Sequence, residues 1–530
     1  MLRFSLYQQS LDEVDPDAIG LEEDSFERHL PWLVCRLVSP EDFKGFYVED
    51  QGAGTCCPLM LLAMLLLQFR YQVSDKELVR RCRRDLGWRY AIGLHGDKKP
   101  PSVTSVRRFR GKLRELKGED FIFASSLRLA VDEGLLEDVE LQGVDSTNTD
   151  CRGAVVDTFN LVATGIGQVL RKVAGCLGER AELLAARWDL VSYLRRSIKG
   201  GASIDWSDES ARNALLTTEI RDADRLAELV PSLGVRFPSE VEASLELLRR
   251  VARQDVEELP DGTFRIARGT RAGRVISISD PEARHGRKSS SKVINGFKTH
   301  VTGTLESQFT TGIKVTDAAT HDAQPTGDLI DQTEANKVKP AELVGDAAYG
   351  TGANRRACQA KGVELRTKLP TPSHKGAFTK RDFDIDIEAR QVTCPAGVTT
   401  THCTMVKDPA GSTTRVPLFR FANQDCGPCA MRAQCGKTVV RNGYRTIALS
   451  VYERELQQAQ AFHATSRAAD VLKSRSAIER LISHLVRLGM RHARFFGMHM
   501  VQFQAFMVGA VYNLQRLLTL KFCSRRVCRA

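Results

Sequence analysis

Glu479 stands between an apolar stripe and a basic stripe in the stretch 473–497. The apolar residues recur every three or four positions, which predicts a helix with one face in a core: Ile478, Leu481, Ile482, Leu485 and Leu488. The basic residues follow the same spacing on a second face: Arg480, His484, Arg487 and Arg491. A lone carboxylate at this border suits a group that meets a phosphate backbone through a metal ion. The alternative is a surface glutamate paired with Arg475, one turn earlier.

Two aspartates stand at the ends of predicted strands far from this helix. Asp145 follows alternating apolar residues in DVELQGVDST, and Asp346 ends the apolar run AELVGD. Adjacent parallel strands would present both aspartates at one edge, where a packed helix can add Glu479. Three converging carboxylates repel one another unless cations neutralise them, and Mg²⁺ favours oxygen ligands. Two ions about 3.5–4 Å apart can activate an attacking water or hydroxyl and stabilise the leaving oxygen of a phosphoryl transfer. Taken singly, each aspartate is more simply interpreted as a strand-end or turn residue, and the spacing alone does not select these three.

The elements that must position these carboxylates alternate along the chain. Residues 20–130 read as helices, and residues 157–255 return to helix after the first strand. Four strand-like stretches follow: TFRIARG, GRVISISD, NGFKTHVTGTL and TTGIKVTD. Residues 365–452 are rich in Thr, Val, Gly, Pro and Cys and read as short strands. We therefore expect five parts, which are a helical domain at 1–130, an α/β core at 131–365 with a helical insertion at about 157–256, a β-rich insertion at 366–452, a completion of the core at 453–520, and a basic tail at 521–530.

Positive charge is concentrated in two regions of a chain whose net charge is +11. Residues 70–117 hold 15 Lys and Arg against 5 Asp and Glu, and residues 471–530 hold 11 against 1. Such regions favour a polyanion, most simply nucleic acid, as partner. Ser74 and Glu77 have capping-box spacing before one basic helix, and a second basic helix carries Arg107, Arg108 and Arg110. This pair predicts a DNA-binding module of the helix-turn-helix sort; the alternative is a pair of solvated helices.

Further polar residues near the predicted strands are candidates for DNA contact. Lys298 and His300 alternate along a strand, so they can point together at a phosphate or lie on an exposed sheet face. Tyr349, just past Asp346, can stack on a splayed base or serve as a partly buried structural residue. His321 can approach a metal site, although a loop histidine is the simpler interpretation.

Cysteines gather in the predicted β-rich insertion. Cys426, Cys429 and Cys435 supply three thiols in a tight loop, and Cys394 is the expected fourth, with His402 or Cys403 as substitutes. Such a set can hold a structural Zn²⁺ in a segment with little core of its own. Reduced thiols and, less simply, a disulfide are the alternatives.

No part of the sequence predicts export or a membrane span. The first ten residues are followed by the acidic run LDEVDPDAIGLEEDSFE, unlike a signal peptide. Residues 56–67 are densely apolar but too few to cross a bilayer, and residues 498–520 carry several polar side chains. We expect a cytoplasmic, nucleoid-associated protein with no membrane partner.

The local contexts of the three acidic residues resemble those of bacterial insertion-sequence transposases of the DDE class. GVDST (143–147) resembles the first-aspartate motif, and VTDAATHD (315–322) with VGDAAYGT (344–351) resembles the surroundings of the second. SDPEARHGRKS (279–289) and NGFKTHV (295–301) resemble the strands between them. SRSAIERLISHLVRLGMRHARFFG (474–497) resembles the glutamate helix, CPAG with CGPC the cysteine-bearing insertion, and LLAMLLLQFRYQVSDKELVRRCRRDLGWRYAIGL the helical N-terminal domain. Together these stretches cover most of residues 45–515.

The resemblance implies a ribonuclease-H-like α/β core in which Asp145, Asp346 and Glu479 hold two Mg²⁺ or Mn²⁺ ions. It implies a DNA transposase that binds terminal inverted repeats, cleaves the element ends and joins them to target DNA, as a homodimer in a synaptic complex. It also implies DNA contacts from the arginines of the glutamate helix: Arg475, Arg480, Arg487, Arg491 and Arg494. Two other functions remain open, which are an inactive or domesticated DNA-binding derivative and a metal-dependent nuclease without strand transfer.

The glutamate helix departs from the family pattern at two positions. Related helices carry a tyrosine three residues before the arginine and a lysine seven residues after the glutamate. Here these positions are Leu472 and Val486, with Arg487 one step further on. Arg475 is the matching arginine.

Overall fold

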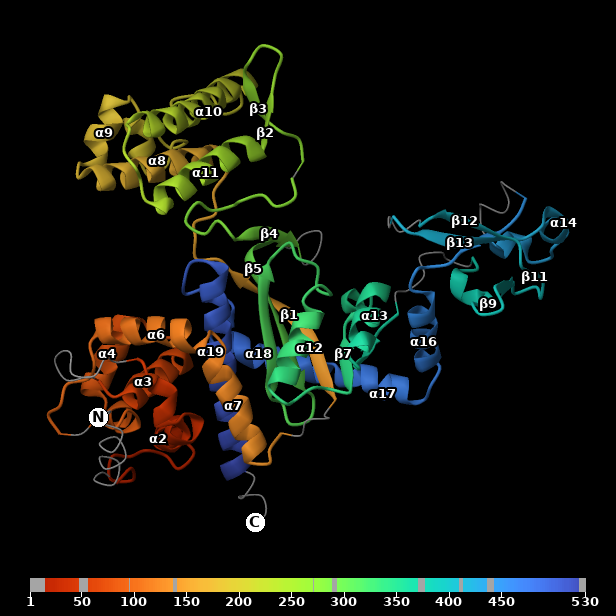
Figure 1. Cartoon of the computed structure of the whole chain (residues 1–530), viewed down its shortest axis with the longest axis horizontal. Coiled ribbons are helices and arrows are strands. Elements are labelled where there is room, and N and C mark those ends of the chain that lie inside the picture. The colour runs from red at the N-terminus through yellow and green to blue at the C-terminus, as the bar shows by residue number, and fades with distance from the viewer. Residues whose placement is uncertain are drawn as a thin grey trace.

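A mixed six-stranded sheet lies at the centre of the molecule and carries two of the three acidic residues (Figure 1). This computed structural model describes residues 15–46, 56–94, 96–136, 141–269, 271–287, 293–369, 377–408, 413–435 and 443–523. The strands of the central sheet are β1 (Gln142–Asp150), β4 (Arg284–Arg287), β5 (Val293–Thr304), β6 (Thr310–Asp317), β7 (Glu342–Gly345) and β8 (Glu364–Thr367).

The order of pairing is that of a ribonuclease-H-like fold. β5 pairs antiparallel with β1 on one side and with β4 and β6 on the other. β1 continues into a parallel pair with β7, and β7 pairs in parallel with β8. The predicted α/β class is therefore confirmed. Two strand predictions were wrong in detail, because β1 runs on to Asp150 rather than ending at Asp145, and residues 273–280 form no strand.

The N-terminal helices share one apolar core with the central sheet. They are α2 (Phe26–Leu37), η1 (Pro40–Phe43), α3 (Pro58–Arg70), α4 (Asp75–Arg84), α5 (Leu86–Ala91), α6 (Val103–Lys117) and α7 (Phe121–Asp132). The long helix α19 (Met498–Leu518) lies between them and the sheet (Figure 1). A single apolar core joins Leu62 of α3, Phe123 of α7, Phe506 of α19 and Ile313 of β6, all fully or almost fully buried. The N-terminal module is therefore part of the core that supports the sheet.

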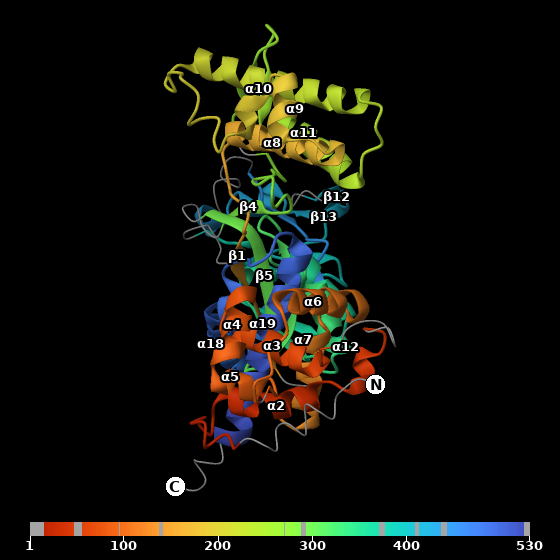
Figure 2. The same cartoon turned by 90° about the vertical axis from the view of Figure 1, so that its left-hand side faces the viewer.

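A helical insertion follows β1 and projects from one end of the sheet (Figures 1 and 2). Its elements are α8 (Thr158–Leu177), α9 (Ala181–Arg187), η2 (Val191–Leu194), α10 (Glu209–Ser232), α11 (Ser239–Gln254), β2 (Val256–Glu258) and β3 (Phe264–Ile266). Leu170, Leu226 and Leu248 belong to an apolar core that is separate from that of the sheet. The predicted helical character of residues 157–255 is confirmed.

A β-rich insertion lies on the other side of the sheet (Figure 1). It contains two small three-stranded sheets. Its elements are η4 (Lys380–Asp382), β9 (Asp384–Asp386), β10 (Gln391–Thr393), β11 (Thr399–Thr400), β12 (Cys403–Lys407), β13 (Arg415–Arg420), α14 (Asn423–Cys426), η5 (Arg432–Cys435) and β14 (Thr446–Ala448). Phe383, Phe419 and Phe421 form its own small core. The predicted β-rich character is confirmed.

Further helices flank the parallel half of the sheet and lead to the edge where Asp145 and Asp346 lie. They are α12 (Thr326–Ala335), η3 (Ala347–Tyr349), α13 (Gly352–Ala360), α16 (Glu453–His463), α17 (Arg467–Ser474) and α18 (Ser476–Leu485). The predicted helix over 473–497 is shorter than expected, because α18 passes into the π-helical turn η6 (Val486–Met490), where Gly489 has a φ of 98°. Arg487 and Arg491 therefore leave the regular spacing of the basic face.

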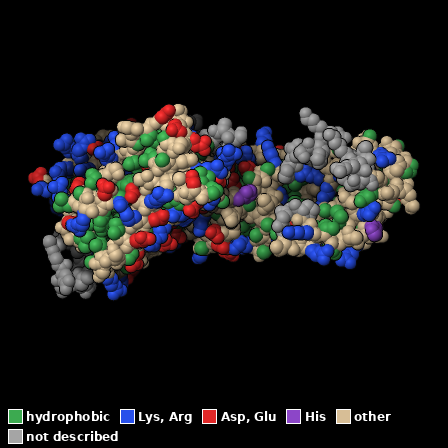
Figure 3. All heavy atoms as spheres, turned by 90° about the horizontal axis from the view of Figure 1, so that it is seen from above, with side chains coloured by type: hydrophobic (Ala, Val, Ile, Leu, Met, Phe, Trp, Pro, Cys, Tyr) green, Lys and Arg blue, Asp and Glu red, His purple; other side chains and the backbone are tan. Residues whose placement is uncertain are grey.

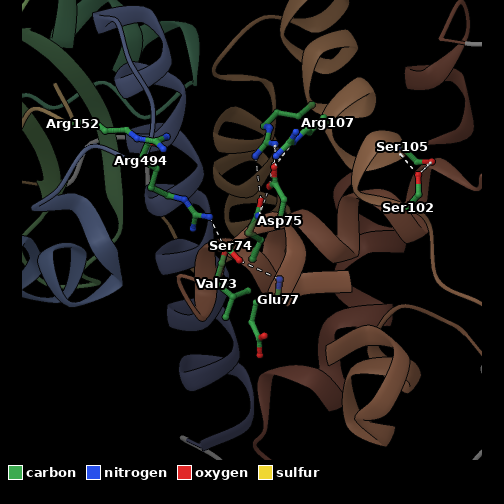
Figure 4. A network of polar contacts seen from close by, with 11 residues as sticks. Val73, Ser74, Asp75, Glu77, Ser102, Ser105, Arg107, Arg152 and Arg494 are labelled. Carbon is green, nitrogen blue, oxygen red and sulfur yellow. Dashed lines mark hydrogen bonds and ion pairs between the residues drawn. The ribbon is translucent and has the colours of Figure 1, made fainter. Parts of the chain in front are cut away.

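The segment after α18 is held between β1 and the N-terminal module (Figure 4). Thr149 donates to the carbonyl of Met490 at 2.9 Å, and the Asp150 N–H donates to the carbonyl of Arg491 at 2.8 Å. From the other side, the Arg494 guanidinium donates to the carbonyl of Val73 at 2.5 Å. Gln72 donates to the carbonyl of Arg487 at 2.6 Å. The N-terminal module thus fixes the turn that follows the Glu479 helix.

Across the described ranges, no helix is both long and apolar enough to cross a membrane.

Candidate active site

Asp145 lies on β1 where the parallel pairing with β7 has ended. The pairing covers Gln142 and Gly143, so Asp145 stands two residues beyond it while still opposite Val301 of β5. The N–H of Ser146 donates to the Asp145 carboxylate at 2.7 Å. The side chain is 20% exposed, so it is largely desolvated yet reachable.

Asp346 is the first residue after β7. Its carboxylate accepts the N–H of Ala348 at 2.9 Å and so caps the short η3 turn. Since β1 and β7 are adjacent and parallel, Asp145 and Asp346 lie at the same edge of the sheet. The predicted adjacency of the two strands is confirmed.

Glu479 reaches this edge because α18 packs very closely on two strands. Its neighbours Ile478 and Leu481 are fully buried. A Cβ at Gly143 of β1 would lie 2.8 Å from the Cβ of Ile478, and one at Gly303 of β5 would lie 2.6 Å from Leu481. These two glycines leave the space in which α18 rests, and Glu479 projects from it beside the sheet edge.

All three carboxylates line one cavity of about 560 Å³. Other polar side chains on its wall are Ser146, Asn148, Arg287, Lys298, Asp322, Ser483 and Arg491. Lys298 forms an ion pair with Asp322 at 2.9 Å, and Ser146 donates to the same carboxylate at 3.1 Å. The cavity therefore combines an acidic floor with cationic walls, as a site for a phosphodiester near metal ions requires. The sequence did not single out Asn148, Arg287 or Asp322 as candidates, although Asp322 directly follows the candidate His321.

Arg475 lies between two of the three carboxylates. It forms an ion pair with Asp145 at 3.4 Å and another with Glu479, and the latter is the pair anticipated for a surface glutamate. Burial, with Asp346 and Glu479 nearby, raises the pKa of Asp145 to about 6, against the opposing effects of the Ser146 N–H and Arg475. Asp346 and Glu479 thus add to the effect of burial on the negative charge of Asp145, and Arg475 forms ion pairs with two of the three carboxylates.

The three carboxylates are suitable ligands for a hard divalent cation, although they are not arranged as a complete coordination shell. Within the described parts of the chain, no three His, Cys, Asp or Glu side chains lie close enough together to hold a metal ion as they stand. The fit rests on the chemistry of the site. Carboxylate oxygens are the preferred ligands of Mg²⁺, and burial together with Asp346 and Glu479 raises the pKa of Asp145, so a bound cation would stabilise its ionised form.

The residues expected around the second aspartate divide between the pocket and the core. Lys298 faces the cavity, as above, whereas His300 is fully buried and contacts Thr316 at 3.0 Å. Burial lowers the pKa of His300 to about 4. Tyr349 is also fully buried, so its ring offers no face to a DNA base, and the expected stacking contact is replaced by a structural role. His321 is exposed on the loop after β6 and accepts the N–H of Ala323 at 3.2 Å.

The arginines of the 475–494 segment have different environments. Arg480 and Arg487 are exposed, and Arg491 lines the cavity while bonding to Asn148 of β1. Arg494 is turned toward the N-terminal module, where burial lowers its pKa. Its guanidinium stands over the ring of Phe69 at 5.4 Å. Arg494 is therefore a structural residue in this arrangement and not part of an open DNA-contacting face.

The basic N-terminal helices are confirmed, and they use two of the three predicted arginines in ion pairs (Figure 4). Ser74 caps α4 by accepting the Glu77 N–H at 3.2 Å. Asp75 pairs with Arg107 at 2.8 Å and with Arg110 at 3.1 Å. Arg110 is only 6% exposed, so it is less accessible to DNA than Arg107 and Arg108. Arg107 and Arg108 remain exposed on α6.

Four cysteines line a small cavity in the β-rich insertion. Cys394, Cys426, Cys429 and Cys435 surround about 30 Å³ together with Phe383 and Phe421. All four are free thiols, which argues against the disulfide alternative. Burial raises the pKa of Cys435, and the other three cysteines add to this rise against Arg445. The four thiols therefore converge, but they would have to close inward to coordinate a metal ion.

The outer face of the helical insertion shows no single-sign patch. Seen from above, Lys and Arg side chains alternate with Asp and Glu over the left-hand part of the molecule, where this insertion lies (Figures 1 and 3). A face of mixed charge is typical of a solvated surface rather than a polyanion site.

The fold is ribonuclease-H-like, and its acidic pocket lies where the adjacent parallel strands β1 and β7 present Asp145 and Asp346. Two family models match the chain, one described as a transposase DDE domain over residues 393–518 and one as a transposase domain (DUF772) over residues 19–112. Together these matches indicate an insertion-sequence DDE transposase, which confirms the predicted resemblance. The first match contains Glu479 and the cysteine-bearing segment, whereas Asp145 and Asp346 lie outside it. No curated protein and no solved structure gives a significant match.

Proposed function

We propose that this protein is an active DNA transposase that binds the terminal inverted repeats of its element, cleaves the DNA at the ends and joins them to target DNA. The observation that carries the proposal is the convergence of Asp145, Asp346 and Glu479, from β1, β7 and α18, on one cavity with Lys298 and Arg491 on its wall. The transposase domains at both ends of the chain support the same function.

Each group in the pocket has a role that its position supports. Asp145, Asp346 and Glu479 would hold divalent ions, Mg²⁺ or Mn²⁺, which supply the Lewis acidity that activates the attacking hydroxyl and stabilises the leaving oxygen. Lys298 and Arg491 bind the phosphate next to the cut through charge-assisted hydrogen bonds. Arg475 holds Asp145 and Glu479 together by its two ion pairs and compensates part of their charge.

The N-terminal module would supply recognition of the element ends. The exposed cations of α4 and α6 form its basic surface: Lys76, Arg80, Arg83, Arg84, Arg107 and Arg108. Binding through these phosphate contacts should weaken strongly with salt. Two ends must be brought together for transposition, so we propose that a homodimer forms the synaptic complex.

A structural Zn²⁺ in the β-rich insertion belongs to the same proposal. Cys394, Cys426, Cys429 and Cys435 surround one small cavity and are free thiols, which are suitable ligands. Metal analysis of the purified protein tests this, since about one Zn²⁺ per chain is expected for a four-thiolate site. A metal-free preparation that keeps a folded insertion would contradict it.

End cleavage in vitro tests the function. DNA carrying the element ends should be cut by the wild type with Mg²⁺, and Asp145→Ala, Asp346→Ala and Glu479→Ala should each abolish cutting while DNA binding stays nearly unchanged. Glu306→Ala is the matched control, because Glu306 is an exposed acid on the β5–β6 turn. Any triad variant that cuts like the wild type would remove that residue from the site.

The same assay separates the two alternatives. A wild type that shifts end-containing DNA but never nicks it would be a DNA-binding derivative. A wild type that cuts the ends but forms no joined product from pre-cleaved ends and target DNA would be a nuclease. Because the pocket contains all three carboxylates, it supports the transposase proposal over an inactive DNA-binding derivative.

A further inference from the structure

A second cavity of about 780 Å³ opens beside the catalytic one. The two share Arg287, Lys298 and Asp322, so they are continuous. Arg274, His285 and His321 form the outer part of the second cavity, between β4 and the loop after β6. We call this cavity the β4 groove.

The charge facing the β4 groove is positive. Asp322 is the single acid on its described wall, and Lys298 neutralises it at 2.9 Å. Arg274 pairs with the buried Asp255 at the end of the helical insertion. The Arg287 side chain is exposed and forms no hydrogen bond or ion pair with another described residue, while its backbone pairs with Val293 of β5. This guanidinium stands where the groove meets the catalytic pocket.

Small residues of β4 and the segment after β6 meet closely in the lining of the groove. A Cβ at Gly286 would lie 2.1 Å from the carbonyl oxygen of Ala318, so the two backbones are in direct contact. His285 contacts Asn295 at 2.7 Å and Arg274 at 3.3 Å, which holds the wall beside them. The polar and cationic side chains of the lining suit a sugar–phosphate backbone.

The groove is formed by other elements than the basic surface of the N-terminal module. In Figures 1 and 2, β4 lies at the end of the sheet nearest the helical insertion, whereas α4 and α6 lie beside α19. DNA in the groove and DNA on α4 and α6 would therefore be held by separate parts of the chain.

We propose that the β4 groove binds the sugar–phosphate backbone of double-stranded DNA beyond the cut, with Arg287 contacting the first phosphate outside the catalytic pocket. This inference rests on the proposed function. The same backbone chemistry has two sources, which are the donor DNA that flanks the element before cleavage and the target DNA during joining.

Full-length Arg287→Ala and Arg287→Lys test the proposal, with His321→Ala for the outer wall. Arg236→Ala is the matched control, since Arg236 is an exposed arginine on a distant loop of the helical insertion. In the flank arm, cleavage is compared between ends with a long flank and ends with the flank trimmed. In the target arm, pre-cleaved ends are supplied with plasmid target and joined products are counted. Binding of a random-sequence duplex is measured over a range of salt.

Arg287→Ala should lose on the order of tenfold in the arm whose DNA occupies the groove, as expected for one charge-assisted contact. For Arg287→Ala, the negative slope of log affinity against log salt concentration should become less steep by about 0.9. Arg287→Lys should recover most of this loss, His321→Ala should lose less, and Arg236→Ala should match the wild type. A loss in the flank arm alone identifies flanking DNA, and a loss in the target arm alone identifies target DNA.

Arg287→Ala with unchanged rates in both arms and an unchanged salt slope would overturn the proposal. If the wild type neither cuts nor joins, the proposed function fails, and the salt slope still decides whether Arg287 contacts DNA.

Discussion

Arg475 partly compensates the negative charge of two carboxylates with its single positive charge, whereas each divalent metal ion would bring two. It bridges Asp145 and Glu479, which belong to elements more than three hundred residues apart in the sequence. Its side chain is 24% exposed, so it lies at the boundary between the pocket and solvent. This bridge explains how three carboxylates can share a pocket before any ion or DNA is bound, because like charges at short range otherwise disfavour folding.

A second carboxylate with an unusual environment lies in the helical insertion. Glu219 of α10 is fully buried, and neither of its oxygens has a hydrogen-bond partner among the described residues. Burial, with Asp157 and Asp222 nearby, raises its pKa to about 9 from an ordinary 4.5. Between pH 4.5 and about pH 9, Glu219 therefore stays protonated in the folded protein, whereas it is ionised in the unfolded chain.

The free energy of unfolding should consequently fall as the pH rises from about 4.5 to about 9, by at most about 1.4 kcal/mol per pH unit from this group. Glu219→Gln should remove that dependence, so its advantage over the wild type should be larger at pH 8 than at pH 5 in urea unfolding. Glu228→Gln, on the exposed side of the same helix, serves as the control and should show no such difference. An equal effect of Glu219→Gln at both pH values would show that Glu219 is ionised in the folded state.

At the scale of elements, the close packing of α18 on β1 and β5 positions Glu479. Gly143→Val would place its side chain against Ile478, whose Cβ lies 2.8 Å from the first added atom. We expect a loss of about 1–3 kcal/mol of stability from overpacking. We also expect cleavage to fall further than stability alone explains, because α18 must move away from the sheet edge.

Gly111→Ala gives the matched glycine control. Gly111 lies inside α6, and a Cβ there would meet nothing within 4 Å. Alanine at this helical position should stabilise the protein by up to about 1 kcal/mol and leave cleavage unchanged. Thermal unfolding and the end-cleavage assay measure both variants. Full cleavage by a folded Gly143→Val protein would show that α18 does not need this approach.

The elements were more predictable than their exact ends and environments. Periodicity in 473–497 predicted a helix beside a core, and the alternation around Asp145 predicted a strand. The π-turn at Gly489 was hidden because its cause is tertiary, since Gln72 and β1 hold that segment from outside. The same reason explains Arg110 and Tyr349, whose residue types suit DNA contact but whose neighbours bury them. The convergence of Asp145, Asp346 and Glu479 was not contained in their spacing and came from the family resemblance.

At the scale of the whole molecule, the N-terminal module and the ribonuclease-H-like core should unfold together. Phe123 of α7 packs on Phe506 of α19, with ring centroids 5.4 Å apart, inside the core that also contains β5 and β6. Phe123→Ala should cost about 3–5 kcal/mol and raise hydrogen exchange in both α3 and β6. Exchange in α8 and α11 should change little, because their core is separate.

Leu170→Ala is the reciprocal variant. It removes a fully buried side chain from the core of the helical insertion and should loosen α8 and α11 while leaving α3 and β6 protected. Uniform loss of protection across the chain in either variant would contradict the division into two cores.

The position of α19 has a consequence for how the protein is made. This helix is made several hundred residues after α3 and α7, which bury their apolar faces against it. A nascent or truncated chain that stops before α19 therefore lacks the partner on which its own N-terminal helices fold. Such a fragment should not present a folded N-terminal module.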